Sequence, residues 1–136
     1  INGGGVTLQS YGLGRDSLAR SPEDHLAFIR QTDLYYQTKD YFFVHAGAPV
    51  HQTLAESVAD PEAEDTFLWE RNHINALETP WEKTVIFGHT PRAHLIRRPK
   101  MIGIDTGCVF DSPGMGKLTA LVLPEEKVVQ QYMLDR

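Results

Sequence analysis

The sequence predicts an α/β fold, and two short stretches carry that prediction. Val85–Phe87 is an apolar run of β-branched and aromatic residues typical of a buried strand, and a glycine and His89 follow it directly. Tyr41–Val44 is a second such run, followed at once by His45 and a glycine-containing turn. Because α/β sheets bind ligands at the carboxyl ends of their strands, we expect both histidines at a functional edge of one sheet.

The length and composition fit one modest core. The chain has 136 residues, of which 41% are hydrophobic, so we expect a single domain over residues 1–136. A net charge of −5 argues against a nucleic-acid partner, because clustered Lys and Arg bind phosphate backbones. The basic cluster of Arg92, Arg97, Arg98 and Lys100 is expected to be a solvated loop.

The sequence also indicates a cytoplasmic protein without a membrane partner. It contains no apolar run long enough to span a bilayer. Cys108 is the single cysteine, which excludes an internal disulfide and fits a reducing compartment.

The first elements follow from local signals. Residues 1–20 are rich in turn-forming glycines, and we expect no long element there. Ser21 is a candidate N-cap, Pro22 suits the first helical position and two acidic residues follow, so a helix is predicted over 22–31. The β-rich runs 34–37 and 41–45 predict a hairpin around a short polar turn.

The remaining elements alternate between helix and strand. A short helix is predicted near 54–58 and a longer one over 66–77, where Phe67, Ile74 and Leu77 are spaced for one buried face. An acidic, proline-containing stretch separates the two helices. Beyond the strand that begins at Thr84, three more strands are predicted, and the last two form a hairpin; their ranges are 101–105, 117–123 and 128–134.

His45 and His89 are far apart in the sequence, so only neighbouring strand ends could bring them together. One interpretation is a pair of ligands to one metal ion. The other is two partly buried histidines satisfied by backbone carbonyls, which is the commoner case for an isolated histidine. The repeated strand–His–Gly context favours the metal interpretation.

Arg71 is the candidate for binding a substrate anion. On the predicted helix it shares a face with Phe67, so its guanidinium could emerge beside an apolar contact and reach into a cleft. Its planar fork suits phosphate or carboxylate. By spacing alone, an exposed charge beside Glu70 is equally consistent.

Five short motifs occur in a fixed order. They are F-F-V-H-A-G at 42–47, F-L-W-E-R at 67–71, G-H-T-P at 88–91, I-D-T-G-C-V-F at 104–110 and G-K-L-T-A-L at 116–121. Together they resemble the C-terminal half of the bacterial phosphoprotein-phosphatase-type metallophosphoesterases, the calcineurin-like serine/threonine phosphatases. The resemblance implies a β-sandwich flanked by helices, of which this chain would be the C-terminal portion. It also implies metal-dependent hydrolysis of phosphoproteins.

The resemblance gives roles to three residues. His45 and His89 match two family histidines that bind the second of two metal ions, and Arg71 matches an arginine that grips the substrate phosphate. The intact family would use two divalent ions, of Mn, Fe or Zn, to activate a bridging water. Asp105 matches an aspartate whose role looks structural, and we assign it to no metal.

The family's first three motifs, G-D-x-H-G, G-D-x-V-D-R-G and G-N-H-E, do not occur in this sequence. They would supply the other metal ligands and the general acid, so no catalytic acid is assigned within these residues. With a first residue that is Ile1 and not methionine, we expect part of a phosphatase that is inactive alone and binds at most one ion weakly. We also expect an unpaired strand edge that is open to association with another chain.

Two alternatives remain open at this point. The substrate could be a dinucleoside polyphosphate or another small phosphoester in place of a phosphoprotein. The chain could also be a non-catalytic module that acts through binding.

Overall fold

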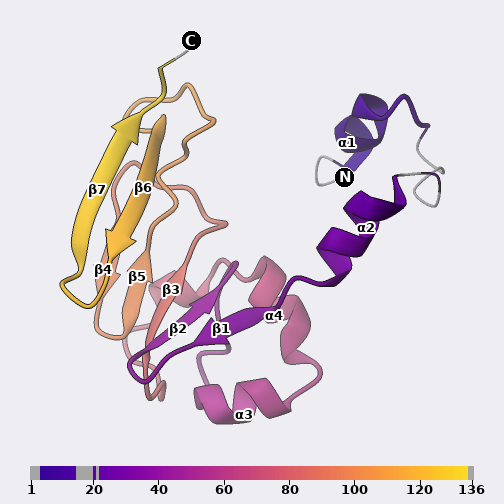
Figure 1. Cartoon of the computed structure of the whole chain (residues 1–136). Coiled ribbons are helices and arrows are strands. Elements are labelled where there is room, and N and C mark those ends of the chain that lie inside the picture. The colour runs from indigo at the N-terminus through magenta and orange to yellow at the C-terminus, as the bar shows by residue number, and fades with distance from the viewer. Residues whose placement is uncertain (1–3, 15–19, 21, 135–136) are drawn as a thin grey trace. The chain divides into compact units, whose positions relative to one another are not determined.

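The computed structural model describes residues 4–14, 20 and 22–134. These residues fall into two compact units, Ile1–Asp33 and Leu34–Arg136 (Figure 1). No helix in the described part of the chain is both long and apolar enough to cross a membrane.

The first unit contains the helices α1 (Gly4–Ser10) and α2 (Glu23–Arg30). α2 confirms the helix predicted over 22–31, and its acidic first turn and basic last turn complement the helix dipole. Ser21, the predicted N-cap, lies outside the described residues. α1 is short, as the expectation of no long element in residues 1–20 allows; it has seven residues and none of them is buried.

A five-stranded mixed sheet forms the centre of the second unit. Its strand order is β1-β2-β3-β5-β4, with β2, β3 and β5 parallel and the outer strands antiparallel to their neighbours. The strands are β1 (Tyr35–Gln37), β2 (Tyr41–Val44), β3 (Thr84–Phe87), β4 (Ile96–Arg98) and β5 (Met101–Gly103). β1 and β2 form the predicted hairpin. The central strand β3 is the apolar run on which the fold prediction rests.

A second, two-stranded antiparallel sheet consists of β6 (Lys117–Val122) and β7 (Lys127–Tyr132). This hairpin was predicted. The guanidinium of Arg97 in β4 forms an ion pair with the carboxylate of Glu126, which lies in the turn between β6 and β7. The α/β class is therefore confirmed, while the β-sandwich stays an expectation of the resemblance.

Two short helices each contribute buried apolar side chains to the core at the central sheet. α3 (Leu54–Ala59) begins with a capping box in which Thr53 and Glu56 bond each other's backbone N–H groups, and it matches the short helix predicted near 54–58. α4 (Ala63–Trp69) contributes Phe67 to a core that includes strand residues from β2, β3 and β5. Figure 1 shows both helices beside the sheet.

The structure corrects the predicted helix over 66–77. α4 ends at Trp69, because Glu70 is extended and its Oε1 accepts hydrogen bonds from the backbone N–H groups of Arg71, at 2.8 Å, and Asn72. A separate 3-10 helix, η2 (His73–Asn75), follows. A side-chain carboxylate thus replaces the helical partners of these N–H groups.

The structure also corrects the predicted basic loop. Residues 96–98 form β4, in which Arg97 pairs with Ile102 of β5 and Ile96 packs against the core. Arg92 and Lys100 flank this strand and are exposed. Periodicity missed β4 because only its first residue is apolar.

Candidate functional site

Both predicted histidines lie where parallel strands end. His45 follows β2 directly, and Gly88 separates β3 from His89. The two strands are neighbours in parallel register, and the Gly88 N–H donates to the His45 carbonyl at 2.9 Å. The backbone therefore fixes the two turns against each other, at the carboxyl edge of the sheet.

The two imidazoles meet at this edge. His45 Nε2 lies 2.9 Å from His89 Nδ1, with the ring centroids 4.8 Å apart and the planes inclined by 63°. The strand-end pattern thus predicted the approach correctly. A role for the pair as metal ligands remains a prediction.

His89 has an unusual backbone conformation for a residue with a side chain. Its φ is 62°, in the left-handed region, which costs a side-chain-bearing residue of order 1–3 kcal/mol. Strain of this kind persists only where the surrounding structure enforces it, and it is concentrated at functional sites. In this strained conformation, the turn directs the His89 ring toward His45.

The surroundings of His89 favour the neutral form of its ring. Burial, and then the charges of Arg71 and His45, lower its pKa from the usual value, while Asp105 opposes the shift. Nε2 is buried without a hydrogen-bond partner among the described residues, which is rare for a buried polar atom. A neutral imidazole retains a lone pair that can bind a metal ion.

The separation of the two nitrogens fits a shared ion. With metal–nitrogen bonds of about 2.0–2.1 Å, two imidazoles at right angles on one ion bring their nitrogens about 2.9 Å apart. The two rings are at hydrogen-bond distance from each other, and that distance matches this value. Residues 4–14, 20 and 22–134 contain no group of three His, Cys, Asp or Glu side chains that could hold a metal, so they would supply two ligands.

Arg71 lies in the loop after α4 and not on a helix, so its expected shared helical face with Phe67 is wrong. Its side chain is exposed, and it is close enough to lower the pKa of His89. With its neighbours it lines an open hollow of about 360 Å³; the lining residues are Asp65, Thr66, Trp69, Glu70, Arg71 and Asn72. Arg71 is therefore near enough to His89 to affect its charge, and the hollow that it lines has room for an anion.

Trp69 is a site residue that sequence reasoning missed. Its ring centroid lies 5.7 Å from that of His89, with the planes nearly perpendicular at 83°. The tryptophan is part of the F-L-W-E-R motif. The apolar pattern of that motif assigns it to the helix but gives it no functional role.

Asp105, for which a structural role was expected, makes hydrogen bonds to two nearby backbone N–H groups. Its Oδ1 accepts the Gly107 N–H at 3.0 Å, and its carbonyl accepts the Arg92 N–H at the same distance. His73, expected to be surface or structural, is 2% exposed and packs its ring 4.3 Å from that of Phe87.

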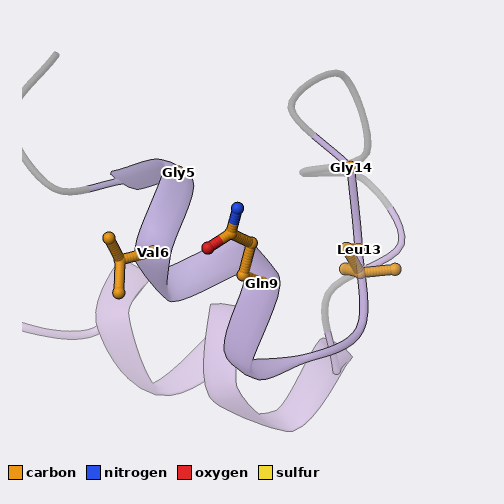
Figure 2. Close-up of a pocket in the computed structure, with 5 residues that line it drawn as sticks. All are labelled: Gly5, Val6, Gln9, Leu13 and Gly14. Carbon is orange, nitrogen blue, oxygen red and sulfur yellow. The ribbon is translucent and has the colours of Figure 1, made fainter.

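A second hollow lies within the first unit (Figure 2). It has a volume of about 320 Å³ and is lined by Gly5, Val6, Gln9, Leu13 and Gly14. Gln9 supplies the only side-chain hydrogen-bonding group among these five, and none of them is ionisable. The described lining residues therefore offer no group for acid–base or metal chemistry.

Comparison with known proteins yields a partial match. No family model matches the chain. A stretch of 47 residues is 47% identical to symmetrical bis(5′-nucleosyl)-tetraphosphatases of Bordetella pertussis, Bordetella parapertussis and Bordetella bronchiseptica. The match covers 35% of this chain and 16% of each relative, so it spans about a sixth of their length. At a coarse level, the chain is thus similar to phosphoester-type hydrolases.

Proposed function

We propose that this chain contributes to a metal-dependent phosphoester hydrolase whose substrate is a dinucleoside polyphosphate. The observation that carries the proposal is the 2.9 Å approach of His45 Nε2 to His89 Nδ1 where β2 and β3 end. The names of the Bordetella relatives support the substrate class.

Each site residue has a distinct task in this proposal. His45 and His89 would hold one divalent ion of Mn, Fe or Zn, for which imidazole is a suitable ligand. The ion would supply activation of water and neutralisation of phosphoryl charge. Arg71 would bind phosphate oxygens through its planar fork, because its exposed guanidinium lies near His89.

The donor set limits what these residues can do alone. Since the described ranges supply two imidazoles and no third ligand, we expect a single weakly held ion and little turnover by the 136 residues. Binding is therefore a sharper test than hydrolysis.

Calorimetric titration of the Mn²⁺-loaded chain with diadenosine tetraphosphate tests the proposal. Arg71→Ala should weaken binding about ten- to hundredfold, the usual loss for a charged hydrogen bond. Arg71→Lys should cost nearly as much, because lysine keeps the charge but loses the fork. Arg98→Ala, which removes an exposed arginine from β4, is the matched control. Unchanged affinity in both Arg71 variants would contradict the phosphate-binding role.

A second candidate function is a serine/threonine protein phosphatase, which the order of the five motifs favours. The same titration with a phosphoserine peptide separates the two. Tighter binding of the peptide than of the dinucleotide would favour the protein phosphatase. Binding of either ligand without any dependence on metal would favour a non-catalytic module.

A further inference from the structure

The two tryptophans of this chain have opposite environments. Trp81 is 3% exposed, and its Nε1–H donates to the Pro49 carbonyl at 2.8 Å. Trp69 is 49% exposed although it ends a helix whose Phe67 is buried in the core. Half of a large aromatic surface is thus left in water, and packing of the core does not account for it.

Trp69 also lies beside the candidate site. Its ring is 5.7 Å from that of His89, and it lines the same hollow as Arg71. Glu70, between them, uses Oε1 to hold the N–H groups of Arg71 and Asn72. The turn is therefore fixed by its own carboxylate, and it presents an aromatic ring and a guanidinium to one open hollow.

We propose that Trp69 is a stacking platform for a nucleobase of the substrate, while Arg71 binds the adjoining phosphates. The inference rests on the proposed function and assigns it a base subsite. An aromatic face binds any base by stacking, without a requirement for sequence-specific hydrogen bonds. Thr66 and Asn72 line the same hollow, and their side chains carry groups that can hydrogen-bond to a base edge.

A base-free polyphosphate separates the two subsites. Inorganic tripolyphosphate carries the charge that Arg71 binds but has nothing to stack on Trp69. Trp69→Ala should weaken binding of diadenosine tetraphosphate about five- to hundredfold, the loss expected for one stacked base, and leave tripolyphosphate binding unchanged. Trp69→Phe, which keeps an aromatic face, should recover part of the loss.

Tryptophan fluorescence gives a second measurement. In a Trp81→Phe background, the dinucleotide should quench the emission of Trp69, and tripolyphosphate should not. If Trp81→Phe impairs folding, the calorimetric comparison of Trp69→Ala with the unmodified chain tests the base subsite without the fluorescence measurement.

The outcomes distinguish the subsite from the proposed function. The base subsite would be overturned if Trp69→Ala weakened binding of both ligands equally or of neither. The proposed phosphate site would still stand in that case, provided that Arg71→Ala weakens binding. If Arg71→Ala changes neither affinity, the proposed function fails whatever Trp69 does. Failure of the Mn²⁺-loaded chain to bind either ligand would contradict both.

Discussion

His89 combines a strained backbone with a ring that contacts two other site residues, His45 and Trp69. Its positive φ and its contacts with His45 and Trp69 point to a residue kept for function at the expense of stability. The sequence predicted its position from the G-H-T-P turn. It could not predict the positive φ, because that depends on how the turn packs.

Replacing His89 by glycine and by alanine should separate strain from function. Both variants lose the ring, so both should lose metal binding. His89→Gly should nevertheless be more stable than His89→Ala by about 1 kcal/mol, since glycine adopts positive φ freely. Thermal denaturation measures the difference. An alanine variant as stable as the glycine variant would show that the turn is not strained.

His73 should make stability depend on pH. Burial lowers its pKa from 6.5 to about 4, with Glu70 opposing the shift. As the pH falls, His73 is protonated in the unfolded chain before it is protonated in the folded chain. The free energy of unfolding is therefore highest above pH 6.5 and falls by up to about 3 kcal/mol as the pH drops toward 4. Urea denaturation should show a shallower fall in His73→Phe. An identical pH profile in this variant would contradict the buried, neutral imidazole.

Among the elements, the loop after β2 and the helix η2 are fitted closely together. A Cβ added at Gly47 would lie 2.7 Å from Cε1 and Nδ1 of His73. The Ala46 N–H also donates to the Phe67 carbonyl at 2.8 Å, which ties this loop to α4. The loop that carries His45 is thus held by two neighbouring segments.

Gly47→Ala should therefore cost about 1–3 kcal/mol of stability, as expected for overpacking. Gly88→Ala is the matched control, because a Cβ there would meet its nearest atoms at 3.7 Å or more, an ordinary contact. In a His73→Ala background the cost of Gly47→Ala should shrink. If Gly47→Ala destabilised the chain equally in the His73→Ala background, the new methyl group would not clash with His73.

Element prediction succeeded where apolar runs were long and failed where a single side chain decided the outcome. The buried run of β3 and the β-rich hairpin of β6 and β7 were readable from sequence. The end of α4 was not, because the Glu70 carboxylate captures two backbone N–H groups. β4 was missed because pairing with β5, rather than its own composition, forms it. For the site, the approach of His45 and His89 was foreseen and Trp69 was not.

At the scale of the whole molecule, the outer edge of β7 pairs with no strand among the described residues. The Met133 N–H donates to the Gly116 carbonyl, so in this register the backbone groups of Val128, Gln130 and Tyr132 point away from β6. Every residue of β7 is exposed, and between Val128 and Tyr132 the strand carries no charge. Natural edges usually carry protecting charges or prolines.

We therefore expect β7 to pair with β7 of a second chain. Val128→Pro removes one outward N–H and should reduce the concentration-dependent mass in light scattering, while the fold persists. The N–H of Val129 faces β6, so Val129→Pro should instead disrupt the hairpin. A mass equal to one chain at all concentrations for the unmodified protein would contradict this expectation.

Titration of the 136-residue chain with Mn²⁺, followed by electron paramagnetic resonance of the free ion, tests most directly whether His45 and His89 share a metal ion. We expect one weak site per chain that is lost in His45→Ala and in His89→Ala and retained in His51→Ala, which removes an exposed histidine. Binding that is unaffected by both site substitutions would contradict the metal site.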